Sequence, residues 1–155
     1  MGDSCMRHVE EHWQTLTLSA NGAFEKGDWQ QAMSLYNDAL YRAEVLNDHI
    51  GDCVRLKIPF IQVFLISCNN LASMYQQLGK DDEGENMLKR SIHYLFHLIR
   101  RKQIDFVEIQ SDLRAAIANY ASFVQQSDEG DAKRRHLVEM VNEQLLENDL
   151  ITTDQ

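Results

Sequence analysis

Apolar and small side chains recur every three or four positions along most of this chain, which is the spacing of one face of an α-helix. The segment 29–47 shows the pattern most clearly, from Trp29 through Tyr36 and Leu40 to Leu46. Other segments repeat it. The pattern therefore predicts six helices, at about residues 9–26, 29–47, 59–78, 82–102, 106–126 and 132–148.

Breaker and capping residues separate these predicted helices. Gly27 and Gly79 are placed to end the first and third helices, and Asp28 is placed to cap the second. Asp105 is a predicted cap for the fifth helix. The segment 48–57 contains a glycine and an aspartate between two apolar patterns, so we expect it to form a loop.

Six helices with short connections predict three helical hairpins, at about residues 9–47, 59–102 and 105–148. The chain has 155 residues, which is the size of one ordinary domain. We therefore expect a single domain, with frayed tails at residues 1–7 and 150–155.

The first two hairpins share one internal spacing. Counting from Gly27 and from Gly79, a small residue follows at five positions, a large one at nine and another small one at twelve. Small side chains allow the two helices of a hairpin to cross closely, and large ones fill the spaces beside the crossing. The matching positions are Ala32, Tyr36 and Ala39 in the first hairpin, and Gly84, Leu88 and Ser91 in the second.

The segment Cys68-Asn69-Asn70-Leu71-Ala72-Ser73-Met74-Tyr75, followed by Gly79, resembles the tetratricopeptide-repeat family. The likeness is to the longer-repeat variant of kinesin light chains and many bacterial relatives. It covers about residues 16–98, and the third hairpin matches only weakly, as a terminal cap does. The two glycines lie 52 positions apart, against about 34 in a standard repeat. An unrelated helical bundle with the same spacings is the alternative.

The resemblance implies an all-α fold, a right-handed stack of three helix-turn-helix hairpins. It also implies that the first helix of each hairpin lines a concave groove that binds a peptide or helical segment of another protein. Amide side chains both donate and accept, so they can hold the backbone of such a segment. Solvated polar residues without a ligand are the alternative. The groove residues carried over are Gln14, Thr17, Asn21, Phe24, Asn69, Asn70, Ser73, Gln76 and Gln77.

The balance of charge narrows the range of partners. The chain has 24 acidic and 15 basic residues, for a net charge of −9. Such a chain repels phosphate backbones and anionic membrane surfaces, so we expect no nucleic-acid partner and no membrane partner. Its three cysteines are an odd number, which favours reduced thiols. With no signal-peptide pattern, the sequence predicts a cytoplasmic protein.

One local pattern suggests chemistry. His8, Glu11 and His12 spell the H-x-x-E-H pattern of one class of zinc proteases, and the two histidines would share a helix face. A third ligand is not evident in the sequence, so we expect no metal and no cofactor. Glycine-rich phosphate loops and nucleophile motifs are also missing. The sequence therefore predicts a protein that is not an enzyme.

These observations favour a non-catalytic protein-binding module or adaptor, without identifying the partner protein. Two other functions stay open: a structural homo-oligomer without a groove ligand, and a small acidic chaperone of the secretion type. A homodimer is expected from residues 60–66, because their apolar side chains cover nearly every side of the third helix.

Overall fold

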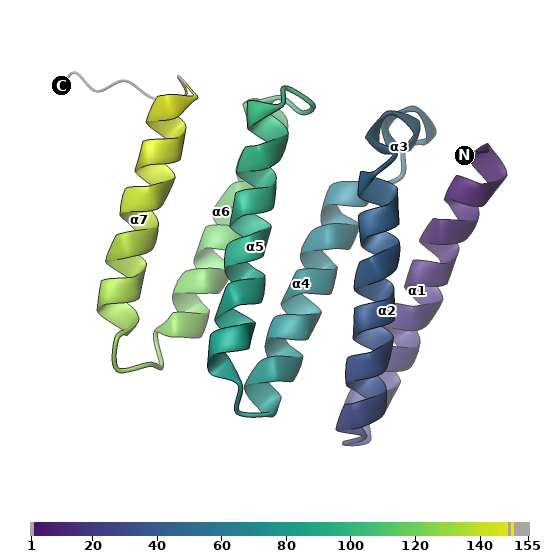
Figure 1. The fold of residues 1–155 in the computed structure, drawn as a ribbon, viewed down its shortest axis with the longest axis horizontal. Coiled ribbons are helices and arrows are strands. Elements are labelled where there is room, and N and C mark those ends of the chain that lie inside the picture. Colours follow the sequence, from purple (N-terminus) through teal and green to yellow (C-terminus); the bar gives the residue numbers. More distant parts are fainter. Residues whose placement is uncertain (1, 149, 151–155) are drawn as a thin grey trace. The chain divides into compact units, whose positions relative to one another are not determined.

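The computed structural model describes residues 2–148 and 150, and in them it shows helices and no strand. The predicted all-α class and its helical hairpins are thus confirmed. Of the tail expected to fray at residues 150–155, all but residue 150 lies outside the described residues. Figure 1 labels the helices, which are α1 (Asp3–Glu25), α2 (Trp29–Asn47), α3 (Ile50–Leu56), α4 (Phe60–Gln77), α5 (Asp81–Arg100), α6 (Phe106–Val124) and α7 (Gly130–Glu147).

The chain divides into two compact units, residues 1–87 and residues 88–155, with the boundary inside α5. Unit 1 contains α1, α2, α3 and α4, and unit 2 contains most of α5 together with α6 and α7.

The two predicted glycine turns have the same geometry. Gly27 has a φ of 77° and Gly79 a φ of 74°, the left-handed conformation that favours glycine. The residue after each glycine donates its N–H to the carbonyl five residues earlier, at 2.9 and 2.8 Å. Asp28 then caps α2, since its Oδ1 accepts from the N–H of Gln31 at 3.2 Å. The equivalence of the two turns, inferred from spacing, is confirmed.

The core of unit 1 forms where α2 packs against α1 and against α4. Ala20 and Ala32 are both fully buried, as expected for small side chains at the crossing of a hairpin. Around them lie the large buried side chains of this unit, which include Met6, Trp13, Tyr36, Leu40, Leu46, Phe60, Phe64, Leu71 and Met74.

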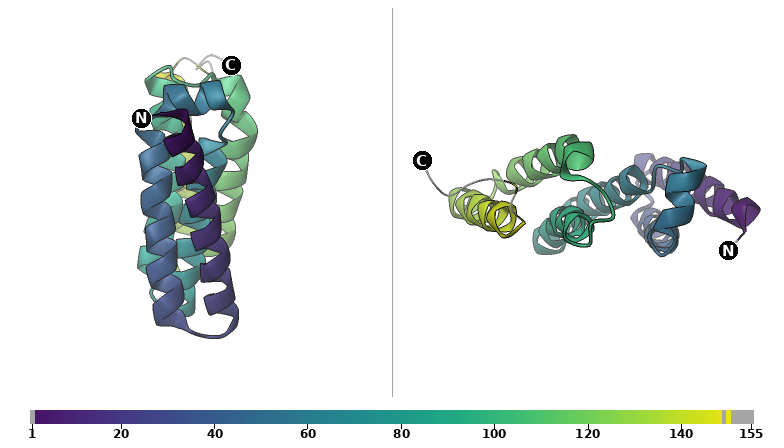
Figure 2. Two further views of the ribbon diagram at one scale, coloured as in Figure 1. Left: turned by 90° about the vertical axis from the view of Figure 1, so that its right-hand side faces the viewer. Right: turned by 90° about the horizontal axis from the view of Figure 1, so that it is seen from above.

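Two expectations about unit 1 were wrong. Residues 3–7 of the tail expected to fray at 1–7 are not frayed, because α1 begins at Asp3 and the side chain of Met6 is fully buried. The segment 48–57 is not a loop, because most of it forms α3. Cys53 of α3 is fully buried, and this burial raises the pKa of its thiol to about 11. Seen from above, α3 lies across the ends of its neighbours in unit 1 (Figure 2).

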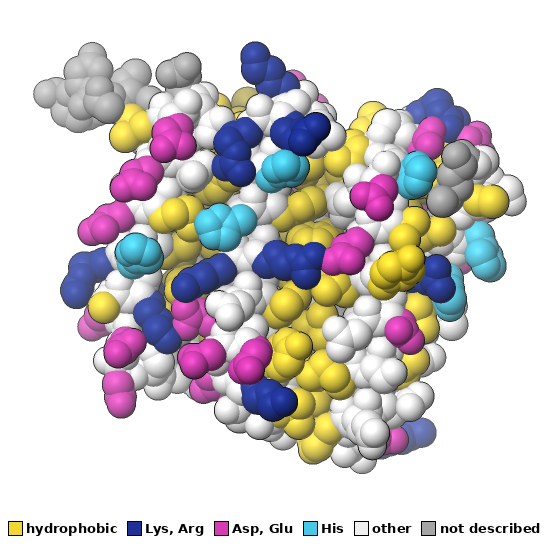
Figure 3. Space-filling view, in the orientation of Figure 1, with side chains coloured by type: hydrophobic (Ala, Val, Ile, Leu, Met, Phe, Trp, Pro, Cys, Tyr) yellow, Lys and Arg dark blue, Asp and Glu magenta, His cyan; other side chains and the backbone are white. Residues whose placement is uncertain are grey.

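Most buried side chains of unit 2 lie on α5 and α6. Asp105 occupies the N-cap position of α6, as predicted, but its side chain accepts no capping hydrogen bond. Figure 3 shows acidic and basic side chains over much of the visible surface of α7. The buried side chains of this unit include Leu88, Ile92, Leu95, Phe96, Leu98, Ile109, Leu113, Tyr120, Val124, Leu137 and Val141.

Candidate functional site

The helices expected to line a groove, α1 and α4, are joined by a buried hydrogen bond. The Nε1–H of Trp13 donates to Oγ of Ser67 at 2.8 Å, and the Ser67 hydroxyl donates to the carbonyl of Val63 at 2.9 Å. Both side chains are therefore satisfied inside unit 1. This bond makes α1 and α4 neighbours, so the predicted groove residues of both helices lie within one unit.

The α4 part of the predicted site forms a continuous polar stripe. Asn69 and Asn70 are half-buried, and Ser73, Gln76 and Gln77 are exposed. Their spacing of three and four places them on one face of the helix. Among the described residues, these five side chains have no hydrogen-bond partner. We call these five residues the amide stripe.

The helix that carries the amide stripe is uncharged. The helix α4 contains no Asp, Glu, Lys or Arg. One turn before Asn70, the side chain of Ile66 is 42% exposed although the other faces of the helix are largely buried. The stripe therefore offers hydrogen-bond donors and acceptors beside one apolar contact, on a helix without charged side chains.

The α1 part of the predicted site is only partly available. Gln14 is exposed and, within the described chain, has no side-chain partner. Thr17 was expected to line the groove surface, but it is only 8% exposed, and its Oγ1 has no hydrogen-bond partner in the described structure. The reason is its place on the buried face, one turn after Trp13 and one turn before Ala20. Thr17 therefore belongs to the buried face of α1 and does not line the groove surface.

Asn21 and Phe24 contribute to the closed end of the first hairpin. The hydroxyl of Tyr36 donates to Oδ1 of Asn21 at 2.6 Å, which commits the carbonyl of this amide to α2. Phe24 packs edge-on against Trp29, with ring centroids 5.2 Å apart. Burial, together with the charge of Glu25, raises the pKa of the Tyr36 phenol. Asn21 therefore has mainly its NH₂ group left for a ligand.

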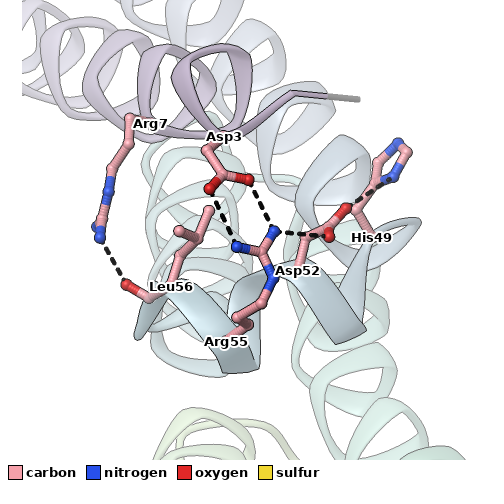
Figure 4. Close-up of polar contacts among 6 residues, drawn as sticks. All are labelled: Asp3, Arg7, His49, Asp52, Arg55 and Leu56. Carbon is pink, nitrogen blue, oxygen red and sulfur yellow. Dashed lines mark hydrogen bonds and ion pairs between the residues drawn. The ribbon is translucent and has the colours of Figure 1, made fainter.

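A polar network fastens α3 to the start of α1 (Figure 4). The guanidinium of Arg55 binds both carboxylate oxygens of Asp3, at 2.7 and 3.0 Å, and also Asp52 at 3.1 Å. Arg7 donates to the carbonyl of Leu56 at 2.7 Å. Hydrogen bonding to Arg55 lowers the pKa of Asp3. The contacts of Arg55 with Asp3 and of Arg7 with Leu56 span about fifty residues of sequence, so spacing rules did not reveal them.

A comparison with protein families places this chain. A family model described as "Protein of unknown function (DUF2753)" matches residues 11–152. The chain belongs to the DUF2753 family. No curated protein and no solved structure matches it. The match covers both units of this DUF2753 chain but begins after Asp3 and Arg7. The resemblance to tetratricopeptide repeats stays a prediction.

The histidine pattern of the DUF2753 chain lies on α1. The rings of His8 and His12 are tilted, with centroids 6.2 Å apart. Among residues 2–148 and 150, no group of three or more His, Cys, Asp or Glu side chains is placed to hold a metal ion. None of the described helices is both long enough and apolar enough to cross a membrane.

His12 instead lines a small cleft on the α1–α2 hairpin. The cleft has a volume of about 180 Å³, and its lining residues are His12, Leu16, Asp38, Tyr41 and Arg42. Arg42 is half-buried, and its guanidinium carbon lies 5.6 Å from the centroid of the Tyr41 ring. The sequence analysis missed this site. Its only local signal is the spacing of three and four between Asp38, Tyr41 and Arg42 on α2.

Proposed function

We propose that this chain is a non-catalytic protein-binding module that holds a segment of another protein along α1 and α4 of unit 1. The amide stripe is the observation that carries the proposal. It presents five polar side chains that have no partner within the described residues, on a helix whose other faces are mostly buried.

The chemistry of the stripe suits a peptide in extended conformation. An amide side chain donates through its NH₂ group and accepts through its oxygen, so it can pair with both polar groups of a peptide bond. Such pairing fixes the backbone of a ligand and does not depend on its side chains. The exposed Ile66 provides a place where an apolar side chain of the ligand can be selected.

The charge of unit 1 favours a ligand that is neutral or basic. Residues 1–87 contain 13 acidic and 6 basic side chains, while α4 contributes none of either. An acidic segment would be repelled as it approached unit 1, and a basic one would be attracted. The net charge of the chain thus acts on the choice of partner and on the association rate.

The test begins with a partner recovered from native lysate by the tagged full chain and mapped to a short segment with overlapping peptides. Asn69→Ala combined with Asn70→Ala should then weaken binding by about five- to a hundred-fold, because each lost hydrogen bond leaves a desolvated group of the peptide unsatisfied. Isothermal titration calorimetry measures the loss. A matched control changes Gln30 and Asn37 of α2 to alanine, which leaves the stripe intact and should leave the affinity unchanged.

Two results would point to another function. If the Asn69/Asn70 variant binds its peptide as the wild type does, the amide stripe is not the binding surface. If light scattering then gives a dimer mass that persists on dilution, the structural homo-oligomer becomes the better proposal. In that case Ile66→Asp should reduce the mass to that of a monomer, because Ile66 is the exposed apolar side chain of α4.

A further inference from the structure

Arg42 has an unusual environment for an arginine. Within the described residues it forms no ion pair, and its Nε atom is buried without a hydrogen-bond partner. A buried N–H group without an acceptor is costly, and more so on a charged side chain. Asp38 lies one turn earlier on α2 and lines the same cleft, but it is not in ion-pair contact with Arg42.

The position of the guanidinium prepares it for an anion. The guanidinium carbon of Arg42 lies over the Tyr41 ring, 5.6 Å from its centroid, which is a cation–π contact. The edge of the guanidinium, with its fork of N–H donors, is the part that binds a carboxylate with two parallel hydrogen bonds. The cleft also contains the His12 ring, a further polar group, and Leu16 as an apolar wall.

We propose that this cleft binds a carboxylate group, with Arg42 as the residue that pairs with it. The volume of about 180 Å³ is below that of a pocket for a drug-sized molecule, so the cleft accepts one such group and a small apolar attachment. Asp38 offsets part of the attraction to Arg42, and its carboxylate repels a dianionic phosphate about twice as strongly as a monoanion.

This site is separate from the amide stripe. His12 and Gln14 are two positions apart on α1, which places them about 200° apart around the helix axis. The lining residues of the cleft belong to α1 and α2, and none belongs to α4, which carries the amide stripe. A negative test of the peptide groove would therefore not contradict the carboxylate site, and a negative test of the carboxylate site would not contradict the groove.

Nuclear magnetic resonance on the full chain tests the proposal directly, because the Nε–H of Arg42 gives its own signal. The probes are acetate, N-acetyl-alanyl-alanine with a free carboxylate, the same dipeptide as its C-terminal amide, inorganic phosphate, and sodium chloride at equal ionic strength. We expect a saturable shift of the Arg42 Nε–H signal with a carboxylate at or below about 50 mM. A response to acetate identifies a free small carboxylate, and a response to the acid dipeptide alone identifies a chain terminus.

Variants sharpen the result. Arg42→Gln should weaken carboxylate binding by about tenfold or more, as read from the backbone signals around the cleft. Asp38→Asn should strengthen it by a few-fold, because a like charge is removed. Arg135→Gln, at an exposed arginine of unit 2, is the matched control and should change nothing. If the spectrum of Arg42→Gln shows that this variant does not fold, two other variants are used for the test. Asp38→Asn should strengthen carboxylate binding, and Tyr41→Leu should weaken it.

Several outcomes would overturn the proposal. They are the absence of any shift with either carboxylate, an equal shift with the amide or with sodium chloride, tighter binding of phosphate, and unchanged binding by Arg42→Gln or by Asp38→Asn.

Discussion

The α1–α2 hairpin of unit 1 and the α6–α7 hairpin of unit 2 have helices of similar length but are packed very differently. In the first, α2 has 19 residues and buries six of them: Ala32, Tyr36, Ala39, Leu40, Ala43 and Leu46. In the second, α7 has 18 residues and buries only Gly130, Leu137 and Val141. The difference lies in how much apolar surface each second helix removes from water, which is the main source of its stability.

The connections of the two hairpins differ as well. Gly27 is needed for its backbone conformation, with a φ of 77°, and little lies near the place of a side chain. Gly130 is needed for space, because a Cβ there would collide with the carbonyl oxygen of Val124 and approach Cα of Gln125 to 3.3 Å. The first glycine makes a tight turn, and the second allows the start of α7 to meet the end of α6.

These contrasts suggest that unit 1 is the stable part of the molecule and that α7 opens more easily. A region with few buried apolar side chains exchanges its amide protons through local openings of low free energy. The candidate sites agree with this division, because the amide stripe and the carboxylate cleft both lie in unit 1. A binding surface needs fixed geometry, whereas a terminal element can be loosely held.

A matched pair of leucine truncations gives the largest expected effect. Leu71→Ala should lower the free energy of unfolding by about 2–5 kcal/mol, because Leu71 is 1% exposed and a cavity would form in the core of unit 1. Leu137→Ala should lower the free energy of unfolding by an amount at or below the lower end of that range, since α7 can shift to fill the cavity. Chemical denaturation of both variants measures the difference. Equal losses would mean that α7 is packed as firmly as α4.

Two glycine substitutions should act in opposite directions. Gly130→Ala should destabilise the α6–α7 hairpin by about 1–3 kcal/mol, because the backbone must move away from the added methyl group. Gly22→Ala, inside α1 with open space around the position, should stabilise by roughly 0.5–1 kcal/mol through helix propensity. Thermal unfolding of each variant checks the signs, and a destabilised Gly22→Ala would show that α1 is more crowded than the structure indicates.

Sequence patterns were informative wherever the cause of a feature lies within about one helical turn. The spacing around Gly27 and Gly79 correctly predicted two equivalent turns, and the cap at Asp28 was also correct. The pattern failed where distant residues decide. Asp3, at the start of α1, pairs with Arg55, which is 52 positions away. The segment that forms α3 was predicted to be a loop, because its glycine and its aspartate are typical of loops and it has few apolar residues.

The candidate sites show the same limit. The amide stripe followed from the resemblance to a repeat family together with helical spacing, and three of its residues are exposed and two half-buried. The burial of Thr17 and the bond between Asn21 and Tyr36 depend on how α1 packs against its neighbours. Arg42 follows Asp38 by one helical turn, a spacing at which the two side chains often pair. The sequence does not show that they are unpaired, so the cleft at Arg42 was missed.

A smaller effect is expected from the hydrogen bond that closes the first hairpin. Tyr36→Phe removes the donor to Asn21 and should cost about 1 kcal/mol at neutral pH. The folded protein raises the pKa of the Tyr36 phenol, so its contribution is complete below about pH 10 and is lost as the pH rises further. Titration at the phenolate absorption band should show one fewer late-ionising tyrosine in the variant than in the wild type. An unchanged number of late-ionising tyrosines in Tyr36→Phe would assign the shift elsewhere.

The smallest expected effects come from two lysines and decide whether the units unfold together. Lys57 and Lys102 have φ values of 59° and 55°, a conformation that costs an L-residue about 1–2 kcal/mol and glycine almost nothing. Each forms the left-handed turn after a helix, with the next residue donating to a carbonyl five positions back at 2.9 and 3.1 Å. Because glycine also raises the entropy of the unfolded chain, Lys57→Gly and Lys102→Gly should each stabilise by only about 0.5 kcal/mol.

One lysine belongs to each unit. If the whole chain unfolds in one step, both variants raise the same transition by a similar amount in scanning calorimetry. If α7 and its surroundings open first, Lys102→Gly raises only the lower transition and Lys57→Gly only the upper one. The contrast between the two hairpins leads us to expect the second result.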